Sequence, residues 1–180
     1  MHRTFTVNEY NDYINLAIDM VAKEALLNKV DESVTLASDT YQYTLSTQFL
    51  YVHGIEMESS TSGVYNREKP INPLYWRILR ASTVELEFVK ELWSPIADRA
   101  LRITGLSSPS KLDTDSEASP VNPAYITYQA AALLHQSRIR GDDVDSEYHR
   151  GQMILCQGMA NEVRETIRVS LGGAIPVIES

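Results

Sequence analysis

The chain has 180 residues and a formal net charge of -8, with 24 acidic side chains against 16 lysines and arginines. Proteins that follow phosphate backbones usually carry a basic face, so this balance disfavours direct nucleic-acid binding. The single cysteine, Cys156, excludes an internal disulfide framework and favours a reducing compartment. No run approaches the roughly 18 apolar residues of a membrane span. The N-terminus lacks a signal-peptide pattern, so we expect cytoplasmic synthesis and no membrane partner.

The first predicted element is a helix over about residues 7–28. Thr6 and Glu9 have the spacing of a capping box. Apolar residues then recur every three or four positions, at Tyr10, Ile14, Ala17, Val21 and Ala25. Leu16, Met20 and Leu27 widen this apolar arc, so the helix is expected to pack on more than one side.

Residues 33–106 form the predicted β region. Apolar residues alternate with polar ones from Val34 to His53, which is the period of a strand. Strand patterns return in "LYWRILRA", "TVELEFV" and "ALRITG". The turn-rich segment 59–72 between them predicts a projecting loop. We expect that loop to contact another protein chain through Ser62, Val64, Tyr65, Asn66, Arg67 and Lys69.

Two helices follow the β region. Asn122 suits an N-cap and Pro123 suits the first helical position, so the second helix is predicted to begin there and to end near Ile139. The last helix is predicted to start between residues 142 and 145 and to run to about residue 170, and the short connection predicts an antiparallel hairpin.

Gly151 and Gly158 lie seven residues apart in the last helix, and each lowers helix propensity. Close approach of another helix is the simplest compensation, so Gly158→Leu is expected to destabilise the protein. The order of elements predicts an α+β fold. It has one domain over 1–180, with antiparallel strands, a projecting loop or hairpin, and a small helical bundle from 7–28 and 123–170.

Residues 171–180 are predicted to form an extended docking tail. The segment is apolar, follows two glycines and is interrupted by a proline, so it has no partner in the local pattern. We expect the tail to order only on docking to another protein. Its predicted docking residues are Ala174, Ile175, Pro176, Val177, Ile178, Glu179 and Ser180.

Candidate chemistry is sparse. Ser108 and Lys111 match S-x-x-K without the partner motifs of a β-lactamase-like site. Asp145 and His149 lie one helical turn apart, where a surface pair is favoured over a metal site. Cys156 has no basic neighbour in the pattern and is expected to be an inert thiol. We therefore predict no catalytic, cofactor or metal site, and no enzyme.

Several segments together resemble the head-to-tail adaptor, or connector, proteins of tailed bacteriophages. They are "SVTLASDTYQYTLSTQF", "NPLYWRIL", "ALRITGL", "LDTD" and "NPAYITYQAAALLHQS". That family has a leading helix, a strand entry, a tryptophan-bearing strand, an "R-I-x-G" strand and an aromatic-alanine helix. The matching positions are Tyr43 and Leu45, Trp76, Arg102 to Gly105, and Tyr125 to Leu134; Ser46 departs from the family's proline.

The resemblance implies a structural protein of the virion neck. Its copies would form a ring, commonly a homo-dodecamer, between the portal and the tail or nozzle proteins. DNA would pass through the channel without specific binding, and an acidic surface would disfavour sticking. The tail residues 174–180 would dock on the portal.

Two other functions stay open at this point. A carbohydrate-binding or other binding module of a phage tail would use the tyrosines of the strand region, at Tyr41, Tyr43, Tyr51, Tyr65 and Tyr75. An interface or core role for these tyrosines is favoured over sugar binding. A small hydrolase built around Asp145 and His149 is the weakest alternative.

Overall fold

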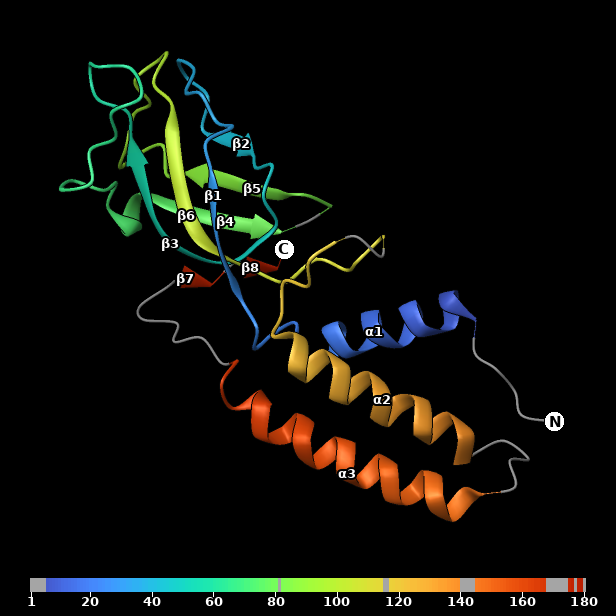
Figure 1. Ribbon diagram of the computed structural model, residues 1–180. Helices are drawn as coiled ribbons and strands as arrows, with labels where there is room; N and C mark the ends of the chain where they lie inside the picture. Colours follow the sequence, from blue (N-terminus) through green and yellow to red (C-terminus); the bar gives the residue numbers. More distant parts are fainter. Residues whose placement is uncertain are drawn as a thin grey trace. The chain divides into compact units, whose positions relative to one another are not determined.

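The computed structural model describes most of the chain and divides it into two compact units. The described residues are 6–80, 82–114, 117–139 and 145–167, with the backbone alone of 175–176 and 178–179. The helical unit comprises residues 1–26 and 109–169, and the sheet unit comprises residues 27–108 and 170–180. The fold is α+β, as predicted, with an N-terminal helix, two small sheets and a C-terminal helix pair (Figure 1).

The helical unit contains α1 (Val7–Val21), α2 (Pro123–Ile139) and α3 (Ser146–Arg164). The predicted capping box of α1 is confirmed: the backbone N of Glu9 donates to Thr6 Oγ1 over 3.3 Å, and the N of Thr6 donates to Glu9 Oε2 over 2.8 Å. The helix is shorter than predicted because it ends at Val21. The apolar stripe continues to Ala25 and Leu26, but these side chains are buried after the helix has ended.

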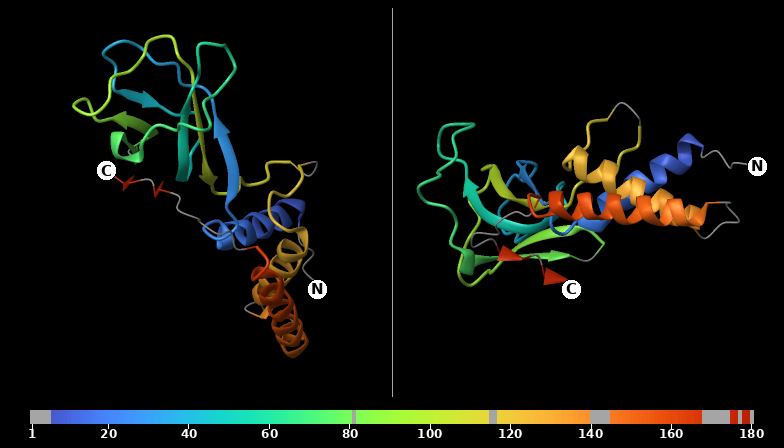
Figure 2. Two further views of the ribbon diagram at one scale, coloured as in Figure 1. Left: turned by 90° about the vertical axis from the view of Figure 1, so that its left-hand side faces the viewer. Right: turned by 60° about the horizontal axis from the view of Figure 1, so that its bottom comes forward.

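The second helix begins where the sequence predicts. Asn122 Oδ1 accepts a hydrogen bond from the backbone N of Ala124 over 3.0 Å, and Pro123 opens the helix. α2 and α3 run in opposite directions, and the three helices lie side by side (Figures 1 and 2). Their shared core contains one large aromatic side chain, Tyr125, among small and medium apolar ones: Ala17, Ile18, Val21, Ala25, Val121, Ile126, Ala130 and Ala160.

The sheet unit contains two four-stranded sheets. The first has the order β1-β6-β3-β7, and the second has the order β2-β5-β4-β8. The strands are β1 (Leu27–Asp31), β2 (Gln42–Thr44), β3 (Phe49–Met57), β4 (Trp76–Arg80), β5 (Val84–Phe88), β6 (Leu101–Ser107), β7 (Ile175–Pro176) and β8 (Ile178–Glu179). A 3₁₀ turn, η1 (Pro73–Tyr75), precedes β4. All pairings are antiparallel except β4 with β8.

A core of large apolar side chains holds the sheet unit together. Alternate residues of β5, Val84, Leu86 and Phe88, are buried, as expected of strands with one face in a core. Phe88 stacks on Trp93 with ring centroids 4.0 Å apart. The indole Nε1 of Trp76 donates to the carbonyl of Ile71 over 3.2 Å, so its polar atom is satisfied.

A buried carboxylate fixes the end of β1. Asp31 is 2% exposed. Its oxygens accept hydrogen bonds from the backbone N and Oγ of Ser33, from Ser46 Oγ and from the backbone N of Thr47, over 2.6 to 2.9 Å. Burial raises the pKa of Asp31, but these four hydrogen bonds outweigh it and lower the pKa to about 2. The carboxylate therefore joins β1 to the turn before β3.

The sequence did not predict β1. Residues 28–30 are exposed on both faces of the strand, so "LNKVD" shows no alternation. The strand nevertheless pairs with β6 from Leu27↔Ser107 to Asp31↔Ile103. By contrast, Val34 and Leu36 are buried as predicted, but they flank a single isolated bridge, Thr35↔Ala100, rather than a full strand.

Candidate functional site

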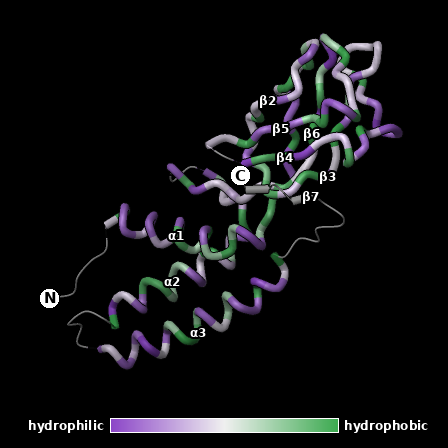
Figure 3. The backbone as a smooth tube through the Cα atoms, turned by 180° about the vertical axis from the view of Figure 1, so that it is seen from behind, coloured by the Kyte–Doolittle hydropathy of each residue, from purple (hydrophilic) through white to green (hydrophobic). Residues whose placement is uncertain are grey.

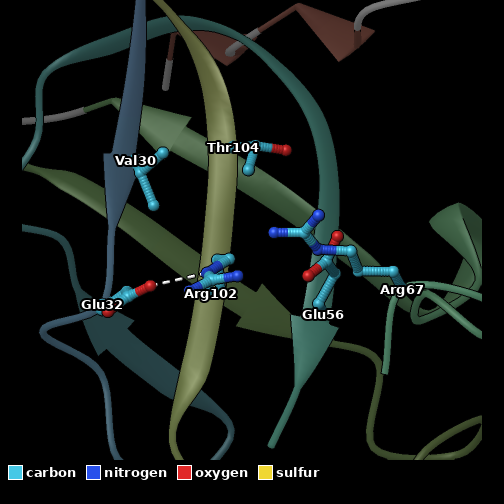
Figure 4. A pocket seen from close by; sticks show the side chains of 6 residues that line it. All are labelled: Val30, Glu32, Glu56, Arg67, Arg102 and Thr104. Carbon is cyan, nitrogen blue, oxygen red and sulfur yellow. Dashed lines mark hydrogen bonds and ion pairs between the residues drawn. The ribbon is translucent and has the colours of Figure 1, made fainter. Parts of the chain in front are cut away.

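A charged pocket lies on the outer face of the first sheet. Leu101 and Ile103 of β6 are buried in the core, so Arg102 and Thr104 point to the opposite face. The pocket has a volume of about 710 Å³. Figure 4 shows the side chains that line it, from β1, β6, β3 and the segment between β3 and η1: Val30, Glu32, Glu56, Arg67, Arg102 and Thr104.

The side chain of Arg102 is held at the pocket by an ion pair and by an aromatic ring. Its Nε lies 2.6 Å from Glu32 Oε1, and its guanidinium lies 4.1 Å from the centre of the Tyr65 ring. The hydrogen bond to Glu32 raises the pKa of Arg102. Burial, followed by the negative charge of Glu32, raises the pKa of Tyr65. Arg102 is thus pre-oriented by an acid and an aromatic ring.

Glu56 leaves one polar atom unsatisfied at this pocket. Its Oε2 is buried and has no hydrogen-bond partner among the described residues. Figure 4 shows this carboxylate on β3, near the guanidinium of Arg67. Two glutamates and two arginines balance in charge, so the pocket has no excess positive charge to hold a free anion. It holds no nucleophile paired with a base.

The structure brings part of the predicted contact loop to this pocket. The backbone of Tyr65 forms an isolated antiparallel β-bridge with Glu58, and the Tyr65 ring lies against the guanidinium of Arg102. Arg67 lines the pocket. Asn66 and Lys69 line a second pocket of about 330 Å³ with Tyr75 and Trp93. Ser62 and Val64 are exposed at the turn. The loop residues therefore border two pockets of one unit.

Glu58 organises the turn of this loop. Its carboxylate accepts hydrogen bonds from the backbone N of Gly63 over 2.5 Å and of Ala100 over 3.2 Å. These bonds lower the pKa of Glu58. Gly63 has a φ of 75°, a left-handed conformation that favours glycine. The sequence predicted a turn-rich loop here, but not the carboxylate that holds it.

The predicted docking tail has partners within its own chain. The backbone of Ile175–Pro176 pairs with Tyr51 and Val52 of β3, and the backbone of Ile178–Glu179 pairs with Leu79 and Arg80 of β4. The expectation that this segment lacks partners is wrong for these four residues, because both sheets offer it an edge to pair with. Ala174, Val177 and Ser180 lie outside the described residues.

α3 exposes a row of apolar side chains. Tyr148, Leu155 and Met159 are spaced by seven and four residues, which places them on one side of the helix. Leu155 is 56% exposed and the adjacent Ile154 is 62% exposed. We call Tyr148, Leu155 and Met159 the outer row of α3. Figure 3 shows hydrophobic positions interspersed with hydrophilic ones along this helix.

The glycines of α3 do not mark close packing within the chain. A Cβ placed on Gly151 or Gly158 would have no heavy atom within 4 Å. The expectation that Gly158→Leu overpacks a helix interface of the monomer is therefore wrong. Both glycines are exposed beside the outer row, so the helix carries their low propensity without any compensating contact among the described residues.

The residues that the sequence offered as weak catalytic or metal-binding candidates make other contacts in the structure. Lys111 forms an ion pair with Asp19 over 2.8 Å, and Asp145 caps α3 by accepting from the backbone N of Tyr148 over 3.1 Å. Cys156 is a half-buried free thiol. No group of three or more metal-ligating side chains occurs within the described part of the chain. No helix in that part is long and apolar enough to cross a membrane.

His149 contacts a histidine of the neighbouring helix. Its Nδ1 is 2.9 Å from Nδ1 of His135 on α2. Burial lowers the pKa of His135, and the nearby charges of His149 and Arg138 lower it further. The sequence could not predict this pair, because the α2–α3 hairpin register decides which side chains face each other.

The five tyrosines of the strand region do not form one exposed platform. Tyr41, Tyr43 and Tyr75 pack against the core of the sheet unit, and Tyr43 donates its hydroxyl to the carbonyl of Thr40 over 2.8 Å. Tyr65 stacks under Arg102. These contacts favour the core role that the sequence analysis preferred over sugar binding.

Comparison with known proteins adds no assignment: no family model matches the chain, and no curated protein matches it.

Proposed function

We propose that this protein is a structural component of the neck of a tailed bacteriophage, where its copies form a ring between the portal and the tail. The family-like segments support this proposal because they fall on the expected elements. Trp76 lies on β4, Arg102 to Gly105 lie on β6, and Tyr125 to Leu134 lie on α2. Arg102 also lies at the centre of the charged pocket.

The outer row of α3 is the observation that carries the proposal. Exposed apolar side chains gathered on one helix face mark a surface that is covered in an assembly. Burial of each such side chain contributes roughly 1.5 to 3 kcal/mol before ordering costs. The occupant that we propose is a neighbouring copy of the same chain, because a ring repeats one contact between every pair of neighbours.

The other properties of the chain agree with a passive role in the channel. Its net charge of -8 disfavours adhesion of DNA that moves through a ring. The portal and the tail or nozzle proteins are the proposed partners above and below the ring. The charged pocket and the loop that borders it are the proposed contacts with one of these partners.

Assembly of the full-length protein tests the proposal. We expect rings with a central hole in negative-stain electron microscopy, alone or with portal protein, and a matching mass in native mass spectrometry. Leu155→Glu places a charge in the outer row and is expected to abolish the rings. Its circular dichroism spectrum should be unchanged, because Leu155 is exposed in the monomer.

Leu74→Glu is the matched control, because Leu74 is 75% exposed but lies in the sheet unit. This variant should still form rings. Rings that persist in Leu155→Glu would contradict the proposed surface. A protein that stays monomeric at high concentration, both alone and with portal protein, would contradict the proposed function itself.

A further inference from the structure

An apolar groove runs between α2 and α3, and we call it the α2–α3 groove. It has a volume of about 470 Å³. The described residues that line it are all uncharged, and Leu133, Met153 and Ile154 supply much of its apolar surface. At about 100° per residue around the helix axis, the α3 residues of the groove lie about 150° from the outer row. The groove and the outer row are therefore on opposite sides of one helix.

The apolar surface of the groove continues onto α1 through a buried glutamine. Gln129 of α2 accepts a hydrogen bond from Gln157 Nε2 over 3.0 Å, and its own Nε2 lies 3.5 Å from Met20 Sδ. Met20 is exposed, and so is Leu16 one turn before it on α1. Because α2 lies between α1 and α3 (Figure 1), all three helices contribute to this surface.

We propose, on the basis of the ring function proposed above, that the α2–α3 groove receives the outer row of α3 from the neighbouring copy. The contact between neighbours in a ring is heterologous, which means that two different surfaces of the chain meet. The outer row is one of these surfaces, and the groove is the other. Since the two lie on opposite sides of α3, one copy can engage a neighbour on each side.

The dimensions of the two surfaces match. The groove extends along α3 from Met153 to Asn161, which is about 12 Å at the rise of an α-helix. Leu155 and Met159 of the outer row are one turn apart, or about 6 Å. Both side chains therefore fit along one groove, in the manner of an amphipathic helix laid on a hydrophobic surface.

Opposite charges flank the two surfaces. Glu162 is exposed and continues the outer row, seven residues after Leu155. Arg150 is exposed and continues the groove side of α3, four residues before Ile154. A row seated in a groove brings an acid and a base to the same interface, which favours this pairing. A row packed against a second row would bring Glu162 from both copies and Arg150 from neither.

Two adjacent substitutions of the same kind test the contact. Ile154→Glu changes the groove and Leu155→Glu changes the outer row, and both side chains are exposed in the monomer. Neither protein should form rings in negative-stain electron microscopy, because each lacks one of the two surfaces. Leu16→Glu changes the groove side from α1 and should weaken assembly at least tenfold.

An equimolar mixture of the Ile154→Glu and Leu155→Glu proteins separates this contact from other modes of association. The Ile154→Glu protein keeps an intact row, and the Leu155→Glu protein keeps an intact groove. Native mass spectrometry of the mixture should therefore show dimers of one copy of each, which cannot grow further. Self-association of either protein alone should be at least tenfold weaker at the same total concentration.

Val7→Glu is the matched control, because Val7 is an exposed apolar residue of the helical unit that belongs to neither surface. It should form rings like the wild type, and circular dichroism should show intact helices in every variant. Rings of both the wild type and Ile154→Glu would overturn the groove contact and leave the proposed function standing. A mixture that stays monomeric, or Ile154→Glu protein that dimerises alone, would also overturn the contact. A wild type that stays monomeric, alone and with portal protein, contradicts the proposed function and the contact together.

Discussion

The two units of the chain bury their apolar side chains to different degrees. The core of the sheet unit includes Phe49, Trp76 and Phe88, and its exposed large apolar side chains are scattered, with all but Val30 outside the strands. The core of the helical unit relies on four alanines, while α1 and α3 expose larger side chains such as Met20 and Leu155. The sheet unit therefore resembles a finished domain, whereas the helical unit has apolar surface left for assembly.

This difference predicts that the two units respond to different perturbations. Both tryptophans, Trp76 and Trp93, belong to the sheet unit, so tryptophan fluorescence reports its unfolding. Circular dichroism at 222 nm reports mainly the helices of the other unit. The two signals separate the stabilities of the units in one protein.

The largest expected effect is the acid sensitivity of the sheet unit through Asp31. The pKa of Asp31 is about 2 in the folded state against 3.8 for an unperturbed aspartate, so the carboxylate contributes about 2 to 3 kcal/mol of stability above pH 4. That contribution is lost as the pH falls from about 4 to 2. Asp31→Asn should remove this part of the pH dependence in urea unfolding followed by fluorescence.

The control for this prediction is Asp39→Asn, which changes an exposed carboxylate of the same unit. Asparagine also tolerates the left-handed backbone of this position, where φ is 57°. Asp39→Asn should keep the wild-type profile between pH 4 and 2. An Asp31→Asn protein with that same profile would show that the buried carboxylate does not stabilise the sheet unit.

Gly105→Ala tests how tightly the first sheet packs. A Cβ at Gly105 would lie 2.8 Å from Phe49 Cδ1 and closer still to the backbone oxygen of Tyr51, so β3 and β6 must shift. We expect a loss of about 1 to 3 kcal/mol in the fluorescence transition. Gly54→Ala on the facing strand meets no atom within 4 Å and should change stability little. Equal stabilities of the two variants would contradict a tightly packed sheet.

The smallest expected effect lies in the helical unit and has the opposite sign. Gly158→Ala should stabilise the monomer by up to about 1 kcal/mol in the 222 nm transition, because alanine is the better helix former and space is open. The same variant tests whether Gly158 is needed for ring assembly. If the variant is more stable and still forms rings, ring assembly does not require a glycine at this position. A destabilised monomer would show that an unrecognised contact covers this face.

Local signals in the sequence predicted many of the elements. Thr6 with Glu9, and Asn122 with Pro123, gave the starts of α1 and α2, because capping depends only on neighbouring residues. Alternation predicted β4, β5 and β6. The end of α1 and the strand β1 were missed. The end of α1 was missed because the buried apolar residues continue beyond the helix, to Ala25 and Leu26. The strand β1 was missed because its middle residues are exposed on both faces and show no alternation.

The candidate sites depended on contacts that sequence spacing does not reveal. Glu32, Glu56 and Arg102 are far apart in the chain, and only the order β1-β6-β3 brings them together. The same holds for His135 and His149 across the hairpin. The loop between β3 and η1 was predicted as a contact region from composition, but its carboxylate anchor, Glu58, was not.

The first rung of the β1–β6 ladder has a consequence for the folding pathway. Leu27 pairs with Ser107, so the two ends of the segment inserted between α1 and α2 lie side by side. Once this ladder forms, only residues 22–26 and 108–122 still separate the two helices, in place of the whole segment 22–122. Closing that loop without the ladder would cost about 4 kcal/mol of chain entropy. We therefore expect the sheet unit to fold first and to speed the docking of α1 onto α2, whose rate should fall when the ladder is disrupted.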